Sequence, residues 1–226
     1  MHIPDGFIGP GASVVAGIGA AGGFAYAVRR ARVYLTDRLI PLAALTAAFV
    51  FAAQMVNFPV LPGMSGHLIG GVLAAVLVGP AAGYLVLSIV LIVQALIFAD
   101  GGLSALGLNI INMAGVATVG GYWIYRGILR FLPRKNSSVV TAAGVAAALS
   151  IPLAAAAFAA EFAIAGTAQS VSLTSVLWAM VGTHGLIGIG EGVITALVVG
   201  AVVRSRPDLV YGSLTYEGVR AELLIP

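Results

Sequence analysis

The sequence predicts an all-α integral membrane protein with about seven transmembrane helices, its amino terminus outside and its carboxyl terminus in the cytoplasm. Of its 226 residues, 60% are hydrophobic and only 8% are charged, and the mean hydropathy is +1.07. Soluble globular domains carry about 25% charged residues, so the composition excludes a soluble fold. The 30 glycines fit close helix–helix packing in lipid, where small residues let backbones approach.

Apolar runs and the breakers between them give the helices in chain order. A first helix is predicted over 9–28 and a second over 39–58. The next apolar stretch, 66–99, contains the breaker Gly79-Pro80 and fits either one kinked helix or two. Residues 68–78 alone span only about 16 Å, short of the ~30 Å hydrocarbon core. Further helices are predicted over 106–131, 138–165 and 172–204.

The basic residues decide between one and two crossings in 66–99. All 11 Lys and Arg residues fall into groups at 29–38, 126–135, 204–206 and 220. Basic loops stay cytoplasmic, and only two crossings place every group on that side. The short third helix is then predicted to be partial, with an outer half that is loop and lines a cavity. The acids at or near the outer side are Asp5, Asp100 and Glu161.

The opening residues Met1-His2-Ile3-Pro4-Asp5-Gly6 carry the strongest functional signal. The terminal amine of Met1 and the amide and imidazole of His2 lie on one short stretch of chain. Chelation through them closes two small rings and supplies a plane of nitrogens with one position open. A flat all-nitrogen site suits Ni(II) or Cu(II) and does not suit magnesium or calcium.

The remaining donor must be His67 or His184, because the chain has 3 histidines and no cysteine. The predicted topology places His67 outside, after a loop that can fold back over the helix ends, whereas His184 lies within an apolar run. The alternative interpretation makes His2 a solvated terminal residue and His67 a helix cap. The spacing of the histidines alone does not decide between these two interpretations.

A family resemblance is carried by residues 1–7, 65–71, 94–114 and 187–195. These stretches resemble the CbiM/NikM family, the substrate-binding membrane subunits of energy-coupling-factor transporters for cobalt and nickel. The resemblance implies Ni(II) or Co(II) as transported substrate, held by Met1, His2 and His67, with no organic cofactor. It also implies a multi-pass protein of a prokaryotic cytoplasmic membrane that works with a transmembrane coupling subunit and two cytoplasmic ATPases. Whether a small accessory membrane subunit joins them stays open.

Polar residues inside apolar runs are candidates for supporting roles. Asn109 and Asn112 share a helix face near Asp100, and these three residues are expected to support the metal ligands, the asparagines by hydrogen-bonding the folded-back amino terminus. A helix–helix polar contact is the equal alternative for them. His184 and Glu191 share another face, where an ionisable group in a membrane is costly. We favour the interpretation that Glu191 is protonated, or is paired with His184 or a backbone group, and only holds helices together. A functional role of this intramembrane polar pair is the alternative.

The chain is predicted not to be an enzyme. Its only lysine is Lys135, so it has no P-loop and cannot hydrolyse ATP by one. The spacing of Ala44, Ala48 and Ala52 makes a small-residue stripe that either docks a partner subunit or packs within the chain. A stand-alone secondary metal carrier is the alternative function, although such carriers usually show inverted repeats and midplane ionisable pairs. The planar nitrogen site favours nickel, with cobalt as the alternative.

Residues 1–206 are predicted to form one membrane-embedded metal-binding domain, and 207–226 a cytoplasmic tail. The tail contains no further apolar segment, so no fused accessory subunit is expected. The formal net charge is +3, and the basic residues lie in loops rather than in one patch. A nucleic-acid partner is therefore not predicted.

Overall fold

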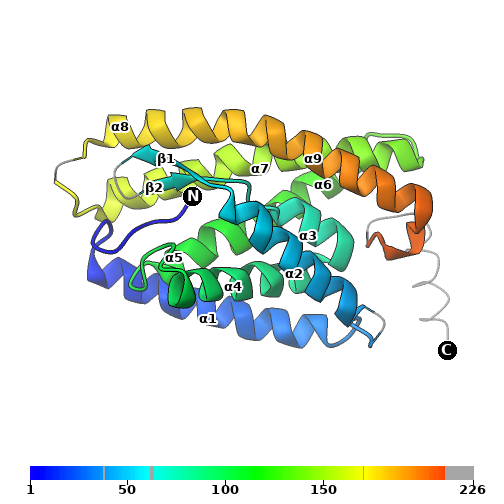
Figure 1. The fold of residues 1–226 in the computed structure, drawn as a ribbon, viewed down its shortest axis with the longest axis horizontal. Coiled ribbons are helices and arrows are strands. Elements are labelled where there is room, and N and C mark those ends of the chain that lie inside the picture. Colours follow the sequence, from blue (N-terminus) through cyan, green and yellow to red (C-terminus); the bar gives the residue numbers. More distant parts are fainter. Residues whose placement is uncertain (38, 62–63, 170, 212–226) are drawn as a thin grey trace.

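The computed structural model describes residues 1–37, 39–61, 64–169 and 171–211, and these are mostly helical (Figure 1). Helices Pro10–Ala31, Pro80–Ile97, Asn136–Ala165 and Leu173–Ser205 are long and apolar enough to cross a membrane, and Ile40–Met55 is a shorter apolar helix. The all-α membrane fold is confirmed. The exact number of crossings and their orientation stay predictions.

The helices follow the predicted order. They are α1 (Pro10–Ala31), α2 (Ile40–Met55), α3 (Gly71–Val78), α4 (Pro80–Ile97), α5 (Leu106–Ile110), the π-helix η1 (Ile111–Gly120), α6 (Gly121–Leu129), α7 (Asn136–Ala165), α8 (Leu173–Leu177), the π-helix η2 (Trp178–Gly182), α9 (Thr183–Ser205) and the 3-10 turn η3 (Pro207–Leu209). The segments α5, η1 and α6 continue one another without a break, as do α8, η2 and α9.

The predicted division of the 66–99 stretch is confirmed at Gly79. This residue has a φ of 84°, a conformation that only glycine adopts without strain, and it separates α3 from α4. Pro80 then begins α4, where its missing N–H costs nothing. The chain therefore reverses direction within a single residue, and α3 is only 8 residues long.

A hairpin that the sequence analysis missed joins α2 to α3. Strands β1 (Phe58–Leu61) and β2 (Met64–Gly66) pair antiparallel, with Phe58 opposite Gly66. Consequently α2 ends at Met55 rather than at the predicted 58. The reason is local, because a residue that precedes proline, as Phe58 precedes Pro59, disfavours the helical region.

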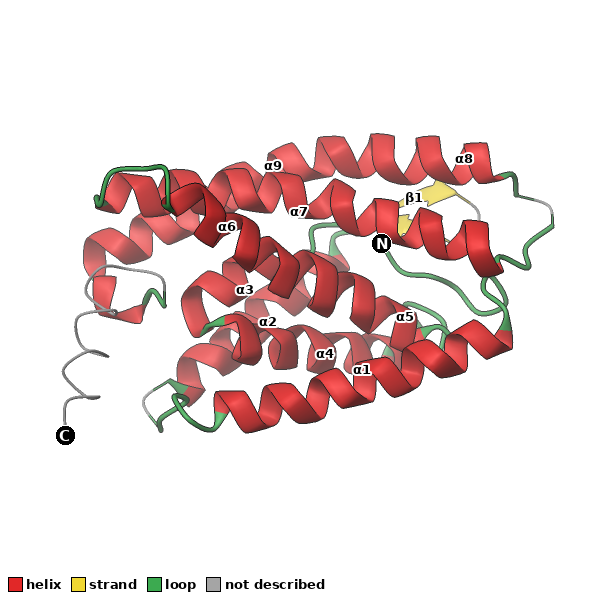
Figure 2. Ribbon diagram, turned by 180° about the vertical axis from the view of Figure 1, so that it is seen from behind, coloured by secondary structure: helices red, strands yellow, loops and turns green. Residues whose placement is uncertain are grey.

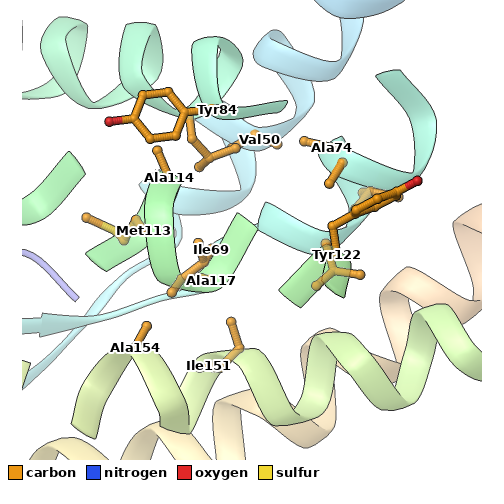
Figure 3. Close-up of a cluster of buried hydrophobic side chains, with 14 of the residues drawn as sticks. Val50, Ile69, Ala74, Tyr84, Met113, Ala114, Ala117, Tyr122, Ile151 and Ala154 are labelled. Atoms are coloured by element: carbon orange, nitrogen blue, oxygen red, sulfur yellow. The ribbon is translucent and has the colours of Figure 1, made fainter. Parts of the chain in front are cut away.

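The core surrounds α3, of which every residue is buried. Side chains from several helices converge beside it, among them Val50 of α2, Tyr84 of α4 and Ile151 of α7 (Figure 3). The close glycine packing predicted from composition occurs between α7 and α9. A Cβ built on Gly192 would lie 2.7 Å from the carbonyl oxygen of Gly144, so neither helix could approach as closely with a larger residue.

The two ends of the molecule differ in charge. Every described Lys and Arg lies near the end where α1, α6 and α9 finish. Asp5 precedes α1, Asp100 follows α4 and Glu161 lies in the last turns of α7, and these helix ends are on the side of the hairpin (Figure 1). Of the predicted tail, Val210 is buried and the Tyr211 N–H donates to the Val76 carbonyl at 2.7 Å. The rest of the tail lies outside the described residues.

Candidate metal centre

The amino-terminal segment folds into the protein, between the hairpin and the helices α5 and α7 (Figure 2). Met1, His2 and Ile3 are each at most 3% exposed. The Ile3 N–H donates to Asn109 Oδ1 at 2.8 Å, and its carbonyl accepts from Asn109 Nδ2 at 3.3 Å. The Gly102 N–H donates to the same carbonyl at 2.9 Å. These bonds satisfy the polar groups of a backbone that has left water.

Residues closer to α1 are fixed at two further places. Asp5 Oδ1 accepts from the Ser104 N–H at 2.8 Å and from its hydroxyl, and these bonds lower the pKa of Asp5. The Thr167 N–H donates to the Phe7 carbonyl at 2.9 Å, just beyond the end of α7. Gly102 is needed at this crossing, because a Cβ there would come within 2.4 Å of the Asp5 nitrogen.

Three nitrogen atoms converge where this segment meets the loop before α3. His67 Nε2 contacts the Met1 amine and lies 3.1 Å from His2 Nδ1. The two imidazole rings are 4.6 Å apart between centroids, and His67 is 1% exposed. The structure thus brings together the three residues that the sequence analysis named as ligands.

Hydrogen bonds on the far side of each ring select its tautomer. His2 Nε2–H donates to Gln94 Oε1 at 3.2 Å, and His67 Nδ1–H donates to the Leu68 carbonyl at 2.7 Å. A neutral imidazole has one donor and one acceptor nitrogen, so His2 Nδ1 and His67 Nε2 present lone pairs to each other. Metal-binding histidines characteristically donate their other N–H to a carbonyl or carboxylate in this way.

The electrostatic setting favours a cation. Burial lowers the pKa of the Met1 amine and of His67 well below their usual values, and it also lowers the pKa of His2. Asp100 Oδ1 lies 3.2 Å from His2 Nδ1. Burial tends to raise the pKa of Asp100, but a proton on His2 Nδ1 would be donated to this carboxylate, and that bond and charge leave the pKa of Asp100 lowered. Burial disfavours this proton on His2, so Nδ1 keeps its lone pair. The nitrogens are thus kept neutral beside an anionic carboxylate.

The loop that carries His67 is fixed by two other helices. Glu191 of α9 accepts from the N–H groups of Ile69 and Gly70, the latter at 2.9 Å. Gln54 of α2 donates to the Ile69 carbonyl at 2.8 Å. Both side chains are almost completely buried. The backbone just after His67 is therefore held from both sides.

Of the two alternatives predicted for Asn109 and Asn112, each residue follows a different one. Asn109 holds the amino terminus, whereas Asn112 donates to Glu161 Oε2 of α7 at 2.8 Å and so makes a helix–helix contact. The wider turns of the π-helix η1 begin at Ile111, between them, so the two asparagines do not act together.

The predicted pair His184 and Glu191 does not form a mutual hydrogen bond within the described residues. His184 Nδ1 donates to the Met180 carbonyl at 2.8 Å, and its buried Nε2 has no hydrogen-bond partner in the described part of the chain. Glu191 bonds to backbone N–H groups, as one of the alternatives expected. Ala44, Ala48 and Ala52 are all exposed on α2, so the small-residue stripe does not pack inside this chain.

A search for clusters of metal-ligating side chains alone does not find this centre. Among the described residues, no group of three or more His, Asp or Glu side chains could hold a metal ion. The convergence depends on a terminal amine, which no side-chain pattern reports. The roles of Gln54 and Gln94 were also missed, although each is a polar residue in a long apolar run, which was the available signal.

Comparison with known proteins agrees with this architecture. The family model described as "CbiM: Cobalt uptake substrate-specific transmembrane region" matches residues 2–209. A relative from Archaeoglobus fulgidus, named as a fused nickel transport protein NikMN, is 41% identical over 93% of this chain and 68% of its own length. The cobalt transport protein CbiM of Geobacter sulfurreducens is 32% identical over 92% of this chain and 61% of its own length.

A solved structure extends the likeness to three dimensions. The crystal structure of a transition metal transporter, 30% identical, matches with a TM-score of 0.84 over 98% of this chain and 99% of that chain. Sequence and fold therefore agree over nearly the whole chain, and the chain belongs to the CbiM family of cobalt uptake substrate-specific transmembrane regions.

Proposed function

We propose that this chain captures Ni(II) or Co(II) as the cargo of an energy-coupling-factor importer. The ligands are the amine of a chain that begins at Met1, the amide nitrogen and Nδ1 of His2, and Nε2 of His67. The nickel and cobalt in the names of the relatives support the choice of cargo. Imidazole and other nitrogen donors suit both metals, and the planar arrangement favours nickel.

The neighbours of His67 Nε2 carry this proposal. In a planar site built from amine, amide and Nδ1 in sequence, the fourth donor lies opposite the amide. It must therefore be adjacent to both the amine and His2 Nδ1. His67 Nε2 has these two neighbours. A histidine that only capped α3 would have no reason to contact both atoms.

Charge balance also supports a divalent cargo. A metal of charge +2 bound to a deprotonated amide leaves one net positive charge, which is costly to bury. Asp100 lies beside His2 Nδ1 and supplies one negative charge. Asn57 Nδ2 reaches its other oxygen at 3.4 Å and helps to orient it. The loaded centre is then neutral.

Energy for uptake would come from other subunits. The chain has a single lysine and no P-loop, so a transmembrane coupling subunit and two cytoplasmic ATPases are proposed partners. The exposed stripe of Ala44, Ala48 and Ala52 is the proposed contact, because small residues allow close helix approach in lipid. A small accessory membrane subunit is a further proposed partner.

The test is uptake of radiolabelled nickel or cobalt into vesicles that contain the chain alone, the chain with its partners, or partners with inactivated ATPases. We expect one metal bound per purified chain in every case, and uptake only with active ATPases. Uptake by the chain alone, driven by an ion gradient, would establish a secondary carrier instead. Elemental analysis after equal supply of both metals identifies the cargo.

A further inference from the structure

A basic cavity of about 510 Å³ lies where α6 finishes and α7 begins. Figure 2 shows that these helix ends are at the end of the molecule away from the amino terminus. Its lining includes Arg126, Arg130, Arg134 and Lys135, and no Asp or Glu is among the described residues that line it. Four of the 11 basic residues of the chain therefore surround one hollow. The preference for basic residues in cytoplasmic loops explains why they occur at this end, but not why they gather around one cavity.

The local fold explains the gathering. Arg126 and Arg130 are four residues apart and share one face of the helix end. The chain then turns through bonds such as Arg130 N–H to the Gly127 carbonyl, and Arg134 and Lys135 return beside that face. Lys135 is the N-cap of α7 and provides no capping side chain, and no acid lies in the first turn. The positive end of the α7 dipole adds to the field.

The other part of the cavity is apolar. Trp123, Leu129, Leu132 and Val139 share the lining with the cations. Trp123 is 66% exposed, and Phe131 next to the cavity is 90% exposed. Exposed aromatic rings at a helix end are typical of the membrane–water interface. A free anion gains nothing from an apolar wall, whereas a ligand with a charged head and a hydrocarbon tail fits both halves.

We propose that this cavity binds the phosphodiester headgroup of an anionic phospholipid, with the acyl chains lying along α6. Basic pockets between membrane helices on the cytoplasmic side are suited to such headgroups. Because the lining is partly cationic and partly apolar, it favours a lipid over free phosphate.

The position of Trp123 permits a local test. The chain has 2 tryptophans, and Trp178 lies in η2, toward the opposite end, so Trp178→Phe leaves Trp123 as the only indole. The full chain would be placed in vesicles of phosphatidylcholine containing brominated phosphatidylglycerol or, separately, brominated phosphatidylcholine. Bromine quenches indole fluorescence on contact. We expect the phosphatidylglycerol to quench at a several-fold lower mole fraction.

Charge removal makes the test specific. The variant Arg130→Gln/Arg134→Gln/Lys135→Gln should lose the preference roughly tenfold or more, since each basic group near an anionic surface contributes substantially. The matched control, Arg29→Gln/Arg30→Gln/Arg32→Gln, removes as much charge from the same end and should keep it. The single variant Arg130→Gln is tested as well, and thermal unfolding curves of both variants show whether a lost preference comes from misfolding.

Several outcomes would overturn the proposal. Equal quenching by the two lipids, or an unchanged preference in the cavity variant, would mean that no anionic headgroup binds there. Equal losses in both triple variants would mean that surface charge in general attracts the lipid. Loss of the preference on adding inorganic phosphate at constant ionic strength would identify a free-anion site.

Discussion

At the scale of single residues, Met1 is unusual because its proposed ligand atom exists only at a chain terminus. An alanine placed before Met1 would convert the amine into an amide. We expect nickel affinity to fall by more than the roughly 10–100-fold that loss of an outer-shell partner costs. Isothermal titration of nickel into purified protein measures it, with an alanine added after Pro226 as the control. Tight binding by the chain extended at Met1 would refute the ligand assignment.

The three histidines provide an internal comparison. His67→Ala removes the donor opposite the His2 amide and should weaken nickel binding by at least about 100-fold, beyond the outer-shell range. His184→Ala should leave the affinity largely unchanged, because His184 bonds to the Met180 carbonyl in its own helix. Thermal unfolding of both variants separates lost binding from lost folding. Equal losses of affinity would mean that the buried Nε2 of His184 is itself a ligand.

The pKa shifts at the centre predict how many protons the metal displaces. Burial lowers the pKa values of the Met1 amine, His2 and His67, so these groups are already neutral near pH 8. A nitrogen whose pKa is lowered gains its proton only at more acidic pH. About one proton per metal should then be released near pH 8, from the His2 amide.

Calorimetry in buffers of different ionisation enthalpy counts these protons. A count near zero would exclude the amide as a ligand. A count of two or more at pH 8 would show that burial does not keep the other nitrogens neutral. As the pH falls through the lowered pKa values, the count should rise and the affinity should drop.

At the scale of elements, α9 positions the His67 loop through Glu191. Glu191→Gln keeps the size of the side chain but leaves one oxygen for the N–H groups of Ile69 and Gly70. We expect roughly tenfold weaker nickel binding and faster hydrogen exchange at these two amides. Glu161→Gln is the matched control, because Glu161 bonds to Asn112 and not to this loop. Weaker binding with unchanged exchange would rule out a positioning role.

The elements also show how far the sequence predicts the fold. Helix ranges and the break at Gly79-Pro80 follow from local chemistry, and the structure has them within a few residues. The hairpin before His67 was missed because the prolines and glycines of residues 59–66 predicted an irregular loop. The partners of Glu191 lie more than 120 residues earlier in the chain. Burial of the amino terminus depends likewise on Asn109. Neither the contacts of Glu191 nor those of Asn109 can be predicted from the pattern of residues near them in the sequence.

At the scale of the whole molecule, the uneven distribution of charge predicts the orientation in the membrane. The chain has no cysteine, so each introduced cysteine is a unique label. Exposed Gln169 lies beyond the end of α7 nearest the metal centre, and exposed Ser137 lies at its start, near the basic cavity. We expect a membrane-impermeant maleimide to label Gln169→Cys in intact cells, and Ser137→Cys only after permeabilisation. The reverse pattern would invert the topology and place the metal centre inside.

The hydrogen bonds that hold Ile3 have a consequence for biosynthesis. Asn109 bonds to Ile3 across 106 residues, and the Thr167 bond to Phe7 spans still more of the chain. The ribosome makes the amino terminus first, but the groups that hold it emerge much later. Met1 is thus the first residue to be synthesised and among the last to be placed. A nascent chain can therefore insert its early helices without a metal site, and binding ability should appear only when the later helices have arrived.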